Sequence, residues 1–203
     1  PAPRTYFAHY YKRYLQFMNE PAITSNDIVM LGNSLTEGGG DWGKRLGKDN
    51  IINRGISGDV AMGIYDRLHQ ILPSKPKQIF LLIGVNDISH DLSTDSIVQM
   101  IEKNVTRIQR ESPETKLYLQ SLLPIDESFN RYKKLTNKTY QIPEINDRLK
   151  ALAKEKKIDF IDLYPLFTEK GTNVLRKELT YDGLHLKEEG YKIWVDAIKK
   201  KMK

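Results

Sequence analysis

Apolar residues occur along this chain in five short, nearly continuous runs. They do not alternate with polar residues, as they would in a strand that is buried on one face only. An unbroken apolar run is typical of a strand covered on both faces, as in a parallel sheet between two layers of helices. We therefore predict five parallel strands, at residues 27–32, 51–54, 78–83, 116–122 and 158–163.

Between these runs, apolar residues recur at the spacing of amphipathic helices. Asp59 is expected to cap the first of these helices, and the sequence LSTD precedes the second. The alternation of strands and helices, with right-handed crossovers, predicts an α/β fold: a three-layer α/β/α sandwich, flavodoxin-like, with strand order 2-1-3-4-5. The four predicted helices span residues 60–72, about 97–108, 144–156 and 187–202.

The N-terminal segment, residues 1–26, is interpreted as an amphipathic helix with its lead-in. The helix is predicted over residues 5–19, and its apolar and aromatic stripe is expected to pack on the core. A homodimer contact or a helix on a membrane surface is the alternative interpretation. The stripe consists of Phe7, Tyr10, Tyr11, Tyr14, Leu15 and Met18.

Length and charge narrow the class of protein. A chain of 203 residues, 39% of them hydrophobic, is enough for one sizeable core, so residues 1–203 are expected to form a single domain. The 32 basic residues exceed the 26 acidic ones, but both are spread along the chain, so nucleic-acid binding is not indicated. No apolar run approaches the roughly 18 residues that a membrane-spanning helix needs.

Cysteine is absent from the chain, which excludes a thiol nucleophile, disulfides and cysteine-ligated zinc. The sequence starts at PAPRTY, without an initiator methionine. This start favours an exported protein, periplasmic or secreted, whose signal peptide has been removed. A trimmed chain or a cytoplasmic protein is the alternative.

Three loops rich in small and amide side chains directly follow the first three predicted strands. They contain GNS at 32–34, NRGISGD at 53–59 and GVND at 84–87. In open parallel sheets, ligands bind beyond the carboxyl ends of the strands, near the point where the strand order reverses. With order 2-1-3-4-5, the three loops are expected to meet at that edge.

These loops could supply a nucleophile and an oxyanion hole. A serine hydroxyl needs a base to activate it, and the charge that develops on a carbonyl oxygen needs hydrogen-bond donors held in place. Ser34 follows the first strand, where it can present both its hydroxyl and its backbone N–H. Gly58 can offer a second backbone N–H at close approach, and Asn86 a side-chain N–H.

The base must be one of four histidines. His185 lies in YDGLHL, three residues after Asp182. A carboxylate at this spacing can accept the imidazole Nδ1–H and leave Nε2 to take the serine proton. Asp-x-x-His alone is a weak signal, since a loop hydrogen bond or half of a metal site gives the same pattern. The other three are His9 and His69, expected on the surface or between layers, and His90, expected near the pocket.

The sequences GNSLTE, NRGISGD, GVND and DGLHL occur in this order and together resemble the four sequence blocks of the SGNH (GDSL-type) hydrolase superfamily. The resemblance covers residues 27 to about 200. Asn33 stands where the superfamily usually has aspartate. Within it the chain is similar to bacterial esterases that resemble platelet-activating-factor acetylhydrolase catalytic subunits.

This resemblance implies a serine esterase that needs no metal and no cofactor. Ser34 would be the nucleophile, and Asp182 with His185 would complete the catalytic triad. The oxyanion hole would consist of the backbone N–H groups of Ser34 and Gly58 and the amide of Asn86.

The substrate is predicted from the loops around the pocket. Most are short and leave little wall for a long acyl chain, so we expect acetyl or similarly short acyl esters of a small molecule or carbohydrate. Trp42, Arg54 and His90 are expected to line the pocket. The 20 residues from Pro124 to Pro143 are either a lid or binding loop or a solvated surface loop. The alternatives are a lysophospholipase or thioesterase, and a non-catalytic carbohydrate-binding protein.

Overall fold

The computed structural model describes residues 4–202 and contains a five-stranded sheet in the order β2-β1-β3-β4-β5. All four pairs of neighbouring strands are parallel. The predicted fold class and strand order are therefore confirmed. The strands are β1 (Ile28–Gly32), β2 (Ile51–Gly55), β3 (Gln78–Leu82), β4 (Lys116–Gln120) and β5 (Asp159–Ile161).

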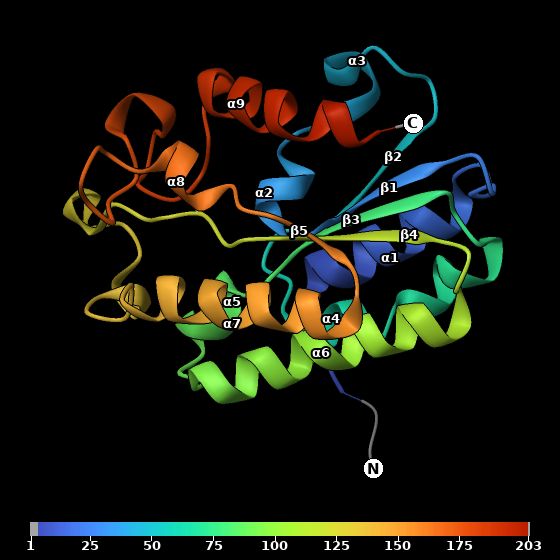
Figure 1. Ribbon diagram of the computed structural model, residues 1–203, viewed down its shortest axis with the longest axis horizontal. Helices are drawn as coiled ribbons and strands as arrows, with labels where there is room; N and C mark the ends of the chain where they lie inside the picture. Colours follow the sequence, from blue (N-terminus) through green and yellow to red (C-terminus); the bar gives the residue numbers. More distant parts are fainter. Residues whose placement is uncertain (1–3, 203) are drawn as a thin grey trace.

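Helices cover both faces of the sheet (Figure 1). In that view α3 and α9 lie on one side, while α4, α6 and α7 lie on the other. All five residues of β1 and of β3 are buried, which explains the continuous apolar runs in these central strands. The helices are α1 (Ala8–Asn19), α2 (Ser34–Glu37), α3 (Trp42–Leu46), α4 (Ala61–Tyr65), α5 (Val85–Ser89), α6 (Thr94–Glu111), α7 (Gln141–Lys156), α8 (Tyr164–Phe167) and α9 (Glu188–Ile198).

The helix predicted over residues 60–72 is much shorter in the structure. Only α4 is α-helical there, and two 3₁₀ turns follow at Leu68–Gln70 and Leu72–Ser74. Asp59 does not act as the predicted cap, because its carboxylate is buried in an ion pair with Arg67. The residue that precedes the first turn is Val60, whose side chain makes no capping hydrogen bond.

The N-terminal helix buries a different face from the predicted one. Tyr10 and Phe17 are buried, whereas Leu15 and Met18 are 57% and 63% exposed. Phe7 and Tyr11 are also exposed. The predicted stripe combined two neighbouring faces of the helix, of which only the one through residues 10, 14 and 17 packs on the protein. Its Tyr10 hydroxyl donates to the carbonyl of Gly63 in α4 at 2.6 Å.

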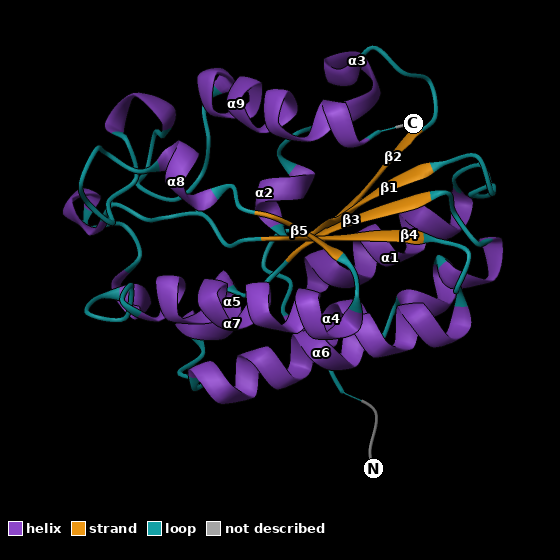
Figure 2. Ribbon diagram, in the orientation of Figure 1, coloured by secondary structure: helices purple, strands orange, loops and turns teal. Residues whose placement is uncertain are grey.

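The remaining predicted helices lie close to their expected residues. Figure 2 distinguishes the helices, strands and loops of the chain. Ser93 caps α6 by accepting a hydrogen bond from the Ser96 N–H, as the sequence LSTD suggested. α7 begins at Gln141, three residues before its predicted start, and α9 is followed by a 3₁₀ turn at Lys199–Lys201. Within residues 4–202, no helix combines the length and apolar character needed to cross a bilayer.

Candidate active site

Ser34 is the first residue of α2, which begins directly after β1. Asn33 holds this turn, because its side-chain oxygen accepts a hydrogen bond from the Leu35 N–H at 3.0 Å. Glycine is required at position 32, where an added Cβ would lie 2.6 Å from the Leu82 carbonyl oxygen. The chain can therefore turn sharply and present the Ser34 side chain at the edge of the sheet.

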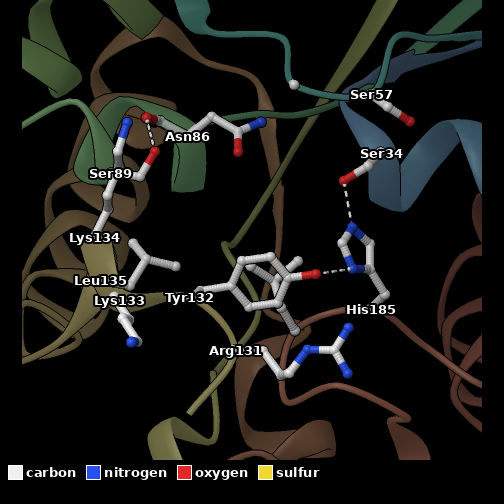
Figure 3. A pocket seen from close by; sticks show the side chains of 12 residues that line it. Ser34, Ser57, Asn86, Ser89, Arg131, Tyr132, Lys133, Lys134, Leu135 and His185 are labelled. Carbon is white, nitrogen blue, oxygen red and sulfur yellow. Dashed lines mark hydrogen bonds between the residues drawn. The ribbon is translucent and has the colours of Figure 1, made fainter. Parts of the chain in front are cut away.

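His185 lies between Ser34 and Asp182. Its Nε2 is 2.9 Å from the Ser34 Oγ, and its Nδ1 is 2.7 Å from the Asp182 Oδ2 (Figure 3 shows the serine and histidine). The two contacts have the geometry of a nucleophile, a base and an orienting carboxylate. The structure thus brings together the three residues that the sequence analysis named as a triad.

The Asp182 carboxylate is held in its charged form. Its burial by itself raises the pKa, but hydrogen bonds from Tyr132, His185 and the Leu184 N–H outweigh this effect and lower the pKa to about 2. The Oδ1 atom accepts the backbone N–H groups of Leu184 at 2.9 Å and His185 at 2.7 Å. An ionised, fixed carboxylate orients the imidazole so that Nε2 faces the serine.

The loop that carries Asp182 and His185 is anchored by Thr180. The Thr180 hydroxyl donates to the His185 carbonyl at 2.6 Å and accepts the Gly183 N–H at 2.9 Å. Gly183 has a φ of 91°, a conformation that favours glycine. The ring of Tyr181 stacks on the His185 ring with their centroids 6.0 Å apart.

Gly58 and Asn86 line the same cavity as Ser34. Gly58 has a φ of 86°, and an added Cβ would lie 2.9 Å from the Phe7 ring. The Asn86 amide donates one N–H to the Asp59 carbonyl at 2.9 Å, which fixes its orientation and leaves its second N–H for a substrate oxygen. The three predicted donors of the oxyanion hole therefore meet at one site.

Two buried carboxylates support the loops from behind. Asp59 pairs with Arg67 at 2.9 Å, and burial raises the pKa of Asp59 to about 6 despite this partner. Arg67 also donates to the carbonyl oxygens of Gly32 at 3.1 Å and Arg54 at 2.9 Å, which ties the ends of β1 and β2 together. Burial likewise raises the pKa of Asp87 to about 7; this side chain accepts the Ala61 N–H. This network was not predicted.

Glu37, at the end of α2, forms a second support, which connects the N-terminal helix to the site. It accepts hydrogen bonds from His9 Nε2 at 2.8 Å and from the Ser57 hydroxyl, and it pairs with Arg13 at 2.8 Å. Burial raises the pKa of Glu37, but its partners outweigh this and keep it below the ordinary value. His9 therefore helps to hold the Ser57–Gly58 turn. His69 lies away from this turn and contacts the Tyr14 hydroxyl at 2.6 Å.

The three residues predicted to line the pocket do not do so, and this part of the prediction is corrected. Trp42 is buried in the core beside Trp194, and its Nε1 donates to the Thr36 carbonyl at 2.9 Å. Arg54 is buried too, paired with Glu20 at 2.6 Å. His90 directly follows α5. Its neighbour Ser89 lines the cavity, but His90 does not.

A cavity of about 720 Å³ opens in front of Ser34, and the 124–143 segment supplies much of its outer wall. This segment contributes Tyr132, whose hydroxyl donates to Asp182 Oδ2 at 2.5 Å and lies 2.9 Å from His185 Nδ1. At these residues the segment forms part of the cavity wall. The sequence analysis named only the loop; an aromatic residue among basic ones, in RYKKL, was the available signal. The lining residues of the segment are Arg131, Tyr132, Lys133, Lys134 and Leu135.

The contacts from Ser34 through His185 to Asp182 have the arrangement of a hydrolase site of the serine, histidine and aspartate type. Residues 30–193 match the sequence model of the GDSL-like Lipase/Acylhydrolase family, and the chain belongs to this family. Within residues 4–202, no cluster of three or more histidine, aspartate or glutamate side chains is arranged to hold a metal ion.

Similar proteins include one curated relative and several solved structures. N-acylneuraminate cytidylyltransferase from Escherichia coli is 25% identical over 177 residues; the match covers 85% of this chain and 39% of the relative, so the chain spans well under half of that protein's length. A Streptococcus pneumonia protein described as a candidate platelet activating factor is 26% identical, with coverage of 96% and 93% and a TM-score of 0.83. An acetyl xylan esterase is 22% identical, with coverage of 87% and 100% and a TM-score of 0.72.

Proposed function

We propose that this protein is a serine esterase that hydrolyses short acyl esters, acetyl esters above all, carried by a small molecule or a carbohydrate. The observation that carries the proposal is the continuous contact from Ser34 Oγ through His185 to Asp182, at 2.9 and 2.7 Å, beside a cavity lined by Gly58 and Asn86. In the proposed mechanism these residues act as the nucleophile, its base and the oxyanion donors.

In the first half of the reaction, His185 Nε2 takes the Ser34 proton as Oγ bonds to the ester carbonyl carbon. The carbonyl oxygen becomes an oxyanion, stabilised by the N–H groups of Ser34, Gly58 and Asn86. The bond from this carbon to the alcohol oxygen then breaks, and His185 gives its proton to the departing alcohol. An acyl group remains on Ser34.

In the second half, water replaces the alcohol. His185 accepts a proton from the water as its oxygen bonds to the acyl carbon, and the same donors stabilise the second oxyanion. The bond to Ser34 Oγ breaks, Oγ regains its proton from His185, and a carboxylic acid is released. Asp182 stays ionised throughout and stabilises the imidazolium that forms in each half.

The cavity offers apolar surface for an acyl group. Leu135 and Leu184 are the aliphatic side chains among its lining residues, and a short acyl group can pack against them. An acetyl group on a sugar also agrees with one of the similar proteins, the acetyl xylan esterase. That name describes the similar protein and supports the proposal by analogy.

The proposal is tested with p-nitrophenyl acetate and p-nitrophenyl octanoate. We expect hydrolysis of the acetate to be faster, and to fall by about a thousandfold or more in Ser34→Ala, because the variant lacks the hydroxyl that His185 activates. Ser25→Ala, at an exposed turn, is the matched control. Equal rates in Ser34→Ala and the unaltered protein would overturn the esterase proposal. Faster hydrolysis of the octanoate would overturn the short-chain part of it.

A further inference from the structure

The outer wall of the cavity is strongly basic. Arg131, Lys133 and Lys134 all line it, and the lining contains no aspartate or glutamate. The three side chains come from one exposed stretch, which places cations on both sides of Tyr132. No ion pair between any of the three and another residue is found within residues 4–202. Their charges therefore face the cavity and the solvent at its mouth.

The acidic groups nearest the cavity do not offset these charges. Asp182 is bonded to His185 and to the Tyr132 hydroxyl, behind the catalytic histidine. Glu37 pairs with Arg13 behind Ser57. Asp91 pairs with Lys138, and this partner holds the pKa of Asp91 below its ordinary value. Glu37 and Asp91 are each paired with a cation, and the single charge of Asp182 does not balance Arg131, Lys133 and Lys134, so the cavity keeps a positive potential.

The cations line the cavity in which the leaving alcohol must lie. Figure 3 shows the Arg131 guanidinium on the His185 side of the Tyr132 ring, with Lys133 and Lys134 on the other side. The leaving oxygen has to be near His185 Nε2, because this nitrogen donates the proton that completes its departure. A group attached to that alcohol therefore lies in the cavity whose outer wall carries Arg131, Lys133 and Lys134.

We propose that the natural substrate carries an anionic group on its alcohol part, and that Arg131, with Lys133 and Lys134, binds it. The inference rests on the esterase function proposed above and adds the charge of its substrate. A carboxylate, as on a sugar acid, and a phosphate, as on a sugar phosphate, share the required chemistry. The Arg131 guanidinium can bind either group with two parallel hydrogen bonds, and the lysines add positive charge.

Three acetyl esters of phenols test this proposal, because they differ only in the group opposite the ester. They are 4-acetoxybenzoate, 4-acetoxyphenyl phosphate and the neutral methyl 4-acetoxybenzoate. The variant is Arg131→Gln with Lys134→Gln, and the control, Lys150→Gln with Lys154→Gln, removes the same charge from exposed positions of α7. Differences in the intrinsic reactivity of the esters cancel when each variant is compared with the unaltered protein.

We expect the Arg131 and Lys134 variant to lose about tenfold in kcat/KM on the anionic esters, mostly through KM, and less than twofold on the neutral ester. The control should leave all three values unchanged, and added salt should weaken the preference in the unaltered protein. Loss on the phosphate alone would identify phosphate as the anion, and loss on the benzoate alone would identify carboxylate.

An anionic-to-neutral ratio that is the same in the variant and the unaltered protein would overturn the inference. This failure is distinct from failure of the esterase proposal. In the first case the neutral ester is still hydrolysed in a Ser34-dependent way. In the second, hydrolysis of the neutral ester is absent or persists in Ser34→Ala.

Discussion

At the scale of single residues, the side-chain amide of Asn86 has both a structural role and a proposed catalytic role. One N–H of its amide holds the Asp59 carbonyl at 2.9 Å, and the other is directed to the oxyanion in the proposed mechanism. The first contact keeps the donor in place before substrate arrives, and such preorganisation is what makes oxyanion donors effective.

We predict that Asn86→Ala lowers kcat by about a hundredfold to a thousandfold, because one of three oxyanion donors is lost. Steady-state hydrolysis of p-nitrophenyl acetate measures the effect, and circular dichroism checks that the variant is folded. A folded variant that retains more than a third of the turnover would remove Asn86 from the oxyanion hole.

Tyr132 acts on the charge of Asp182. Its hydroxyl donates to Asp182 Oδ2 at 2.5 Å, and it is the first of the partners that lower the pKa of this carboxyl to about 2. The ordinary value is 3.8, so the pKa is lower in the folded protein than in the unfolded chain. Ionisation of Asp182 therefore stabilises the fold above about pH 4, and this contribution is lost as the pH falls through 2.

Tyr132→Phe should lower the free energy of unfolding by about 1 kcal/mol at pH 6, because the ionised carboxylate loses a donor. At pH 3 the loss should be smaller, since the unfolded chain is already mostly protonated there and the benefit of ionisation has begun to disappear. Urea unfolding at the two pH values measures both losses. An equal loss at pH 6 and pH 3 would show that Tyr132 acts by packing and not through the charge of Asp182.

At the scale of elements, strands were easier to predict than helices. Each central strand is buried on both faces, so its apolar run is continuous and marks its position within one or two residues. The region after β2 shows why a helix is harder to predict. Its apolar spacing suits a helix through residue 72, but Arg67 turns inward to the Asp59 carboxylate and the chain continues as 3₁₀ turns.

The N-terminal helix illustrates why burial is harder to predict than helix formation. Apolar residues lie on two adjacent faces of α1, and only the face through Tyr10 and Phe17 meets the protein. What distinguishes the faces is long-range: Tyr10 bonds to Gly63, and the Arg54 guanidinium lies 4.5 Å from the centre of the Phe17 ring. Neither partner is visible in the local pattern.

At the scale of the whole molecule, the sheet order brings distant segments to one edge. Short sequence blocks contain Ser34, the loops of Gly58 and Asn86, and the Asp182–His185 loop. The sequence alone could therefore name these residues. Tyr132 and the basic residues around it lie in an irregular connection without such a block. Trp42 begins α3 and Arg54 lies near the end of β2, yet both side chains point into the protein, which only the packing determines.

The central claim is that Ser34 is the nucleophile, and active-site labelling tests it most directly. A fluorophosphonate forms a stable bond to a serine activated by a neighbouring base, and mass spectrometry of the digested protein then locates the added mass. The account predicts one equivalent of label on Ser34, and none in the Ser34→Ala protein. Label on another residue, or no label on a folded protein, would contradict it.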